Sequence, residues 1–180
     1  MKNSLLLFLI FFLLRPCNAI SRDFTFSNIN ESLCISKREI PAAVRDDDGF
    51  IWAASRSGVL RVASDDYRLY QLPFATTDVL QLKMASRGSL LVVATQNGQV
   101  FRYNRILNKF EQWFTLSSLL GNDNWVTNLL IDVDGKVWIS TSIGIFFWTG
   151  KEVARAFDDM AGVSNIALLE DCHSLAFVQS

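Results

Sequence analysis

One pattern of strands and turns occurs three times along the chain, and it constrains the fold more than any other feature. Each copy has an apolar run, an acidic or glycine-containing turn, a second apolar run, and then Ser/Thr-x-x-Gly before a third run. The closing glycines are Gly58, Gly98 and Gly144, which gives a period of roughly 40 residues. The middle copy has one extra residue in its first turn and Val92 where the others have tryptophan. A regular period of this kind predicts stacked supersecondary units.

The turns of each copy predict antiparallel hairpins. Asp48-Gly49 and Asp134-Gly135 are dipeptides that accept the positive φ angles of a type I′ turn. Glycine at the closing position of each copy predicts a positive φ in the next hairpin as well. The structural turn residues expected from the repeat are Gly49, Gly58, Gly98, Gly135 and Gly144.

The apolar runs are short and rich in Val, Ile, Phe and Trp, which favours strands over helices. In the first copy we expect strands near 40–45, 49–55, 58–63 and 66–72. Four short strands per unit are typical of a propeller blade. The sequence therefore predicts an all-β fold, a partial β-propeller of about three and a half four-stranded antiparallel blades. The expected blades are 40–72, 79–115, 125–157 and an incomplete 164–180, with an extended loop over 115–124.

The first residues have the layout of an export signal. Lys2 precedes ten apolar residues, Leu5 to Leu14, and Ala19 ends a plausible cleavage site. We expect a signal peptide over 1–19, with an uncleaved anchor or a lipid on Cys17 as alternatives, and a lead-in strand over 20–39. Export would leave Cys34 and Cys172, and the sequence does not decide whether they pair.

Composition excludes several functions. A net charge of −1 offers no basic surface for nucleic acid. Asp46, Asp47 and Asp48 lack the glutamate and spacing of a calcium loop, so we expect a solvated turn, and the same holds for Asp132 and Asp134. His173 is the single histidine and falls in a predicted turn. The sequence predicts no catalytic residue, no metal ligand and no cofactor.

The motif Asp-x-Asp-Gly-x-x-Trp-x-x-(Ser/Thr)-x-x-Gly resembles the two-component-regulator propeller repeat. It runs from Asp46 through Trp52 to Gly58, and from Asp132 through Trp138 to Gly144. The segment 22–26 is similar to the usual start of such a sensor. The resemblance implies the periplasmic sensor region of a hybrid two-component regulator, which recognises oligosaccharides and signals to a separate histidine kinase. It implies a binding module and not an enzyme.

The resemblance also implies a larger protein. Sensors of this family carry many more blades, so we expect an N-terminal fragment that needs further blades, or a second copy, to close its ring. Side chains near the open edge are expected to be exposed: Leu168, Leu169, Leu175 and Phe177. The alternatives are a secreted propeller that binds or degrades polysaccharide, or a truncated gene product without function.

Tryptophan side chains can stack on sugar rings, so an exposed tryptophan is a candidate ligand contact. Trp52 and Trp138 occupy the same strand position in two copies, which predicts packing in the core. Trp125 follows a polar loop, Gly121-Asn122-Asp123-Asn124, and is the candidate ligand-binding residue.

Overall fold

The computed structural model describes residues 40–55, 58–63, 66–73, 82–158, 162–169 and 174–179. Several sequence predictions lie outside these residues: the signal peptide over 1–19, the lead-in strand over 20–39, both Cys34 and Cys172, and His173. They stay predictions.

The described strands form consecutive antiparallel sheets, each in chain order. The first sheet contains β1 (Ala43–Arg45), β2 (Ile51–Ser55), β3 (Gly58–Ala63) and β4 (Asp66–Tyr70). The second contains β5 (Leu82–Arg87), β6 (Leu90–Thr95), β7 (Gln99–Asn104) and β8 (Lys109–Thr115). The third contains β9 (Val126–Ile131), β10 (Val137–Thr141), β11 (Gly144–Trp148) and β12 (Val153–Arg155). A two-stranded sheet of β13 (Val163–Leu168) and β14 (Leu175–Gln179) follows, so the all-β fold of propeller blades is confirmed.

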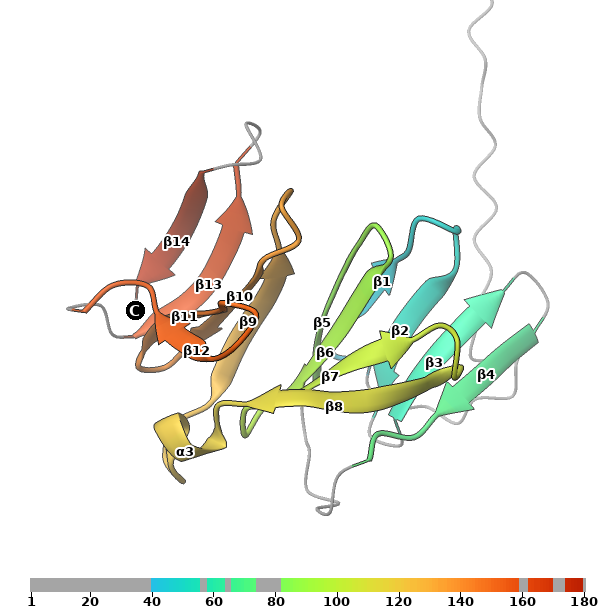
Figure 1. The fold of residues 1–180 in the computed structure, drawn as a ribbon, viewed down its shortest axis with the longest axis horizontal. Coiled ribbons are helices and arrows are strands. Elements are labelled where there is room, and N and C mark those ends of the chain that lie inside the picture. The colour runs from blue at the N-terminus through green and yellow to red at the C-terminus, as the bar shows by residue number, and fades with distance from the viewer. Residues whose placement is uncertain are drawn as a thin grey trace, which may run out of the picture.

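The sheets are arranged as an arc with their first strands on the inside. β1 contacts β5, β5 contacts β9, and β9 contacts β13. Since neighbouring strands within a sheet are antiparallel, the first and third turns of each sheet lie at one end, which we call the turn face. The second turns and the connections between sheets lie at the other end, the crossover face. In Figure 1 the β1–β2, β5–β6 and β9–β10 turns point toward the upper side, and the short helix α3 lies at the lower side.

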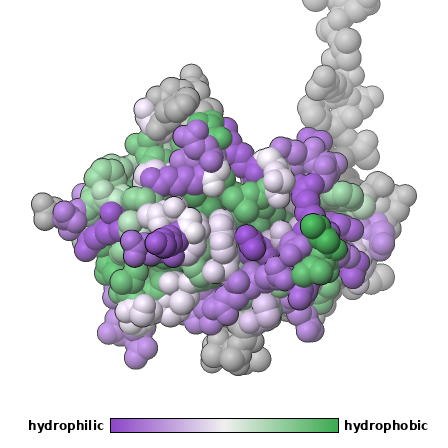
Figure 2. Space-filling view, in the orientation of Figure 1, coloured by the Kyte–Doolittle hydropathy of each residue, from purple (hydrophilic) through white to green (hydrophobic). Residues whose placement is uncertain are grey.

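The core lies between neighbouring sheets. One apolar cluster joins the first and second sheets around Trp52 and Phe101, and another joins the second and third around Val92 and Ile139. Second strands are apolar on both faces because both faces are covered, and Ala54, Val92 and Ile139 are fully buried. On the face of the molecule seen in Figure 2, hydrophilic and hydrophobic residues are mixed.

The sequence predicts type I′ turns at the two acidic positions, and this prediction is wrong. The Gly49 N–H donates to the Asp46 carbonyl (3.0 Å), and the Asp46 N–H donates to the Phe50 carbonyl (3.0 Å). Only Gly49 in this loop has a positive φ, of 90°, whereas a type I′ turn needs positive φ at both central residues. The loop is therefore a three-residue hairpin connection that ends in a left-handed glycine, and Asp132 to Lys136 repeats it.

The closing glycines of the repeat have positive φ, as predicted, with 130° at Gly58, 86° at Gly98 and 143° at Gly144. Gly58 is the most constrained, since a Cβ there would lie 2.2 Å from the Tyr70 carbonyl oxygen on β4. At Gly98 a Cβ would lie 2.8 Å from Cδ1 of Leu120. At Gly58 the backbone of β4 therefore comes too close for any side chain.

Two further expectations were wrong. The stretch 115–124 is not simply an extended loop, because it contains α3 (Ser117–Leu120), whose Leu120 packs in the core. Of the four side chains expected to be exposed near the open edge, Leu169 (48%) and Phe177 (41%) are exposed. Leu168 and Leu175 are half-buried, because they face each other across the β13–β14 pair.

Replacing Gly58 by alanine should destabilise the fold far more than the same change at Gly88. Both glycines have positive φ, but a Cβ at Gly88 would meet no atom within 4 Å. We expect the free energy of unfolding to fall by about 3 kcal/mol or more in G58A, and by about 1 kcal/mol in G88A. Urea unfolding followed by circular dichroism measures both. Equal losses would show that the contact with Tyr70 does not constrain the hairpin.

Candidate functional site

A buried aspartate fixes the first turn of two blades. Asp46 is 7% exposed, and its carboxylate accepts hydrogen bonds from the Phe50 N–H (2.9 Å) and the Trp52 indole N–H (2.7 Å). The third sheet repeats the arrangement, where Asp132 accepts from the Lys136 N–H (2.9 Å) and the Trp138 indole (2.8 Å).

The expectation of solvated aspartates is therefore wrong for Asp46 and for Asp132, which is half-buried. A carboxylate that leaves water needs such donors, and the tryptophan in the following strand supplies one. The sequence signal is the aspartate six residues before each repeat tryptophan. The repeat motif contains it, but its hydrogen bond to the indole was not predicted.

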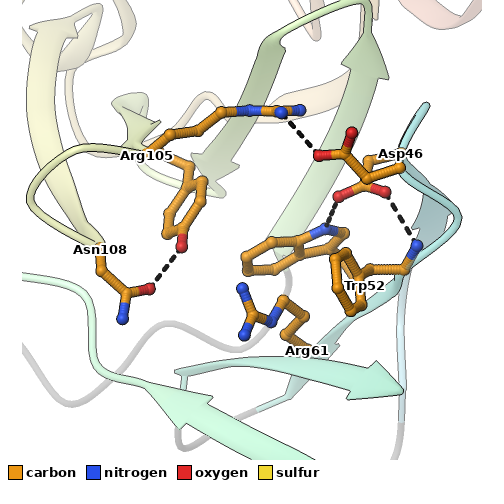
Figure 3. Close-up of a pocket in the computed structure, with 8 residues that line it drawn as sticks. Asp46, Trp52, Arg61, Arg105 and Asn108 are labelled. Atoms are coloured by element: carbon orange, nitrogen blue, oxygen red, sulfur yellow. Dashed lines mark hydrogen bonds and ion pairs between the residues drawn. The ribbon is translucent and has the colours of Figure 1, made fainter. Parts of the chain in front are cut away.

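A cleft of about 440 Å³ opens between the first and second blades on the turn face. The first blade contributes Asp46, Phe50, Trp52 and Arg61. The second contributes Tyr103 from β7, and Arg105 and Asn108 from the β7–β8 turn, as Figure 3 shows. Two polar, adjacent turns held on rigid sheets are a usual setting for a binding site.

Aromatic rings form the floor of this cleft. The centroid of Trp52 lies 4.7 Å from that of Tyr103 and 5.4 Å from that of Tyr70. Tyr70 and Tyr103 meet edge to face at 5.5 Å, and Phe110 closes the cluster below them. Tilted and edge-to-face contacts suit aromatic quadrupoles, so the floor is rigid.

Asn108 joins the two tyrosines from above. Its side-chain oxygen accepts hydrogen bonds from the hydroxyls of Tyr70 (2.8 Å) and Tyr103 (2.5 Å). Its backbone has a φ of 50°, and among the described residues it is the only non-glycine with positive φ. Asparagine tolerates this left-handed conformation better than most residues. Desolvation by burial, followed by the nearby Tyr70 hydroxyl, raises the pKa of Tyr103 to about 12.

Two arginines line the cleft in different ways. Arg105 pairs with Asp48 (2.6 Å), and both side chains are about half exposed to solvent. The Arg61 guanidinium instead lies over three rings, 4.7 Å from the centroid of Phe50, 5.7 Å from Trp52 and 5.9 Å from Tyr70. Among the described residues, no carboxylate forms an ion pair with Arg61.

Trp125, the candidate from the sequence, lies elsewhere. It is 47% exposed on the crossover face, and its backbone is fixed by the Ser142 N–H, which donates to its carbonyl (3.0 Å). It does not line the cleft described above. Trp52 is buried in the core as predicted, and Trp138 is half-buried. The sequence reasoning missed Arg61, Tyr103 and Asn108, because no local motif marks them.

A shallower cleft of about 550 Å³ lies beside the third blade. Trp113 and Trp148 meet there at a centroid distance of 5.9 Å, and the Lys136 ammonium lies 3.5 Å from the centroid of Phe147. Across the described parts of the chain, no group of three or more His, Cys, Asp or Glu could hold a metal ion. No helix in those parts is long and apolar enough to cross a membrane.

The chain resembles solved structures of β-propellers. It matches the extracellular domain of the hybrid two-component system BT4673 from Bacteroides thetaiotaomicron, with a TM-score of 0.66 and 14% identity over 82% of this chain and 21% of that chain. The corresponding domain of BT3049 from the same organism matches with a TM-score of 0.59 and 16% identity, over 86% and 24%. An inactive variant of virginiamycin B lyase from Staphylococcus aureus matches with a TM-score of 0.57 and 16% identity, over 71% and 44%.

These comparisons show a fold. No protein-family model matches the chain, and no curated protein is detectably similar to it in sequence. The chain spans less than a quarter of the length of either sensor domain. The predicted resemblance to the sensors of hybrid two-component systems is confirmed as a structural likeness.

Removing the Asp46 carboxylate should destabilise the first blade. In D46A the Trp52 indole N–H and the Phe50 N–H lose their acceptor. A buried donor left without a partner costs about 1–3 kcal/mol, so we expect the free energy of unfolding to fall by about 2–4 kcal/mol. The matched control is D48A, which breaks an exposed ion pair worth about 0–1 kcal/mol. Similar losses in the two variants in urea unfolding would contradict the role given to Asp46.

Tyr103 should make stability fall at high pH. Its pKa is 10.0 ordinarily and about 12 in the fold, so the folded state holds the proton more tightly than the unfolded state. This contribution is complete below pH 10 and is lost as the pH rises through about 12. Titration of tyrosinate absorbance should therefore show a late-ionising component that is missing in Y103F. If Y103F keeps that component, another tyrosine is responsible.

Proposed function

We propose that this chain is part of the ligand-sensing propeller of a hybrid two-component receptor and is exported to the periplasm. The likeness of its blades to the extracellular domains of BT4673 and BT3049 supports this proposal. The export signal predicted over 1–19 agrees with the location. In this proposal the chain binds and does not catalyse, and a separate kinase carries the signal.

The proposed ligand is an oligosaccharide that binds on the crossover face. Trp125 supports this assignment, because its indole is exposed while its backbone N–H and carbonyl both form hydrogen bonds with Ser142. The Ser142 hydroxyl donates to the side-chain oxygen of Asn124 (3.0 Å), and the Asn124 amide donates to the Leu120 carbonyl (2.9 Å). A rigid aromatic platform can stack on a sugar ring at little cost in conformational entropy. Further blades, or a second copy of the chain, would supply the rest of the ring.

The second candidate is a secreted propeller that binds or degrades polysaccharide. Its specific support is the match with virginiamycin B lyase, which shows that blades of this shape also occur in an enzyme. Fold alone carries little weight for chemistry. The two candidates differ in what the purified protein does to a polymer.

Deleting the gene should abolish the transcriptional response of the source organism to one class of oligosaccharide. RNA sequencing after exposure to a panel of glycans measures that response. W125A should weaken it, while L119A, which removes an exposed side chain (48%) from α3 on the same face, should leave it unchanged.

An unchanged response to every glycan in the deletion strain would contradict the sensor proposal. In a parallel assay, the purified chain is incubated with polysaccharides and the products are separated by chromatography. Release of oligosaccharides would favour the secreted enzyme instead.

A further inference from the structure

The cleft between the first two blades is a separate candidate binding site from the proposed sugar site on the crossover face. Its walls come from the β1–β2 and β7–β8 turns, which lie on the turn face, whereas Trp125 lies on the opposite end of the sheets. We propose that this cleft binds the carboxylate group of a small ligand, between the Arg61 guanidinium and the Asn108 amide.

The charge of Arg61 has no ion-pair partner among the described residues. Its guanidinium stacks over Phe50, Trp52 and Tyr70, and stacking uses the face of the planar group. The N–H donors lie in the plane of the group, so they remain directed outward in the fork that matches a carboxylate. Among the described residues, none accepts a hydrogen bond from this fork or pairs with it. A cation held in this way favours an anionic ligand.

Asn108, on the facing wall of the cleft, has an amide N–H donor that neither tyrosine uses. Two tyrosine hydroxyls donate to its side-chain oxygen, which fixes the orientation of the amide and leaves its NH₂ group turned away from them. Figure 3 shows the Arg61 and Asn108 side chains on facing sides of the cleft, with the Asn108 oxygen directed at a tyrosine hydroxyl and its nitrogen pointing away from that hydroxyl. Donors supplied by two neighbouring blades suit a ligand that only accepts hydrogen bonds, and a carboxylate is such a group.

The acidic residues of the cleft do not pair with Arg61. Both oxygens of Asp46 accept hydrogen bonds, from the Phe50 N–H and the Trp52 indole. Asp48 is paired with Arg105. Asp46 keeps its negative charge, since its donors are neutral N–H groups, but neither carboxylate forms an ion pair with Arg61. The aromatic floor lowers the local dielectric, which strengthens a charge-assisted hydrogen bond above it.

The size of the cleft sets the size of the ligand. A volume of about 440 Å³ lies in the range of small-molecule sites, which is roughly 300–1,000 Å³. The carboxylate can belong to an acidic sugar or to an organic acid, since both offer the same group to Arg61 and Asn108. Either ligand would contact both blades and so resist their separation.

Binding by the purified full chain tests the proposal. The probes are glucuronate, glucose (the same ring without the carboxylate), succinate and inorganic phosphate. Calorimetry measures affinity, and the thermal midpoint measures the stabilisation that a bridging ligand gives. Glucuronate should bind and raise the midpoint, and glucose should do neither. Binding of succinate as tight as that of glucuronate would support the carboxylate and assign it to an organic acid. Phosphate binding tighter than either, equal binding of glucose, or no binding of any carboxylate would overturn the proposal.

Variants locate the site. R61Q should weaken glucuronate binding about tenfold or more, as the loss of a charge-assisted pair requires. The matched control is R68Q, because the Arg68 guanidinium also lies over Tyr70 (5.1 Å) but does not line the cleft. Its affinity should stay unchanged. Equal weakening in R61Q and R68Q would mean general electrostatic attraction and would overturn the assignment.

A second variant keeps the test decisive if R61Q does not fold. N108D retains an oxygen for both tyrosine hydroxyls and tolerates the left-handed backbone, but replaces the NH₂ donor with an acceptor. It should fold and lose glucuronate binding. Undiminished glucuronate binding by a folded N108D would contradict the proposal that the Asn108 amide binds the carboxylate.

Discussion

The packing of one sheet against the next is the constraint on which the rest of this structure depends. No blade buries both faces of its second strand alone, because each sheet is a single layer. Trp52 packs against Tyr103 of β7 and Phe110 of β8 in the next blade, and Ile139 is buried within a cluster shared with the second blade. The apolar runs, the close approach at Gly58 and the short turns all serve this stacking. The apolar clusters consequently lie between the sheets, while the outer strand β4 exposes charged residues such as Asp66 and Arg68.

The turn aspartates extend this constraint into the turns. Asp46 and Asp132 each receive a tryptophan indole N–H, so each turn is tied by a charged hydrogen bond to the strand that fills the core. This is why the loops that line the first cleft are held in place despite their short length and polar sequence. Asn108 has the same role on the neighbouring blade, where it fixes the β7–β8 turn to Tyr70 and Tyr103. The two sides of the cleft are thus ordered independently of any ligand.

The sequence predicted the repeat, the strands and the positions with positive φ, because these depend on local patterns with a fixed spacing. It failed where the outcome depends on contacts between blades. Arg61 occupies an ordinary strand position, and nothing near it in the sequence indicates that Phe50 and Tyr70 lie beneath its guanidinium. Asn108 and Tyr70 are 38 residues apart, so their hydrogen bond could not be read from a motif. Asp46 and Asp132 were predictable in part. Their spacing to the tryptophan is a local pattern, but the hydrogen bond from the indole to the carboxylate is evident only in the structure.

The apolar clusters between sheets differ in size. Among the described residues, those between the first, second and third sheets are large. The cluster around Ile145 contains Val163 and Ile166 of β13, with Leu130, Trp138 and Ala156 packed against it. In a stacked architecture, each layer is held mainly by its nearest neighbours, and the free energy of opening a layer follows the contacts at its own boundary. The β13–β14 hairpin should therefore fluctuate away from the arc more readily than the second sheet. Amide hydrogens would exchange with solvent along a gradient, slowest in β6 and fastest in β14.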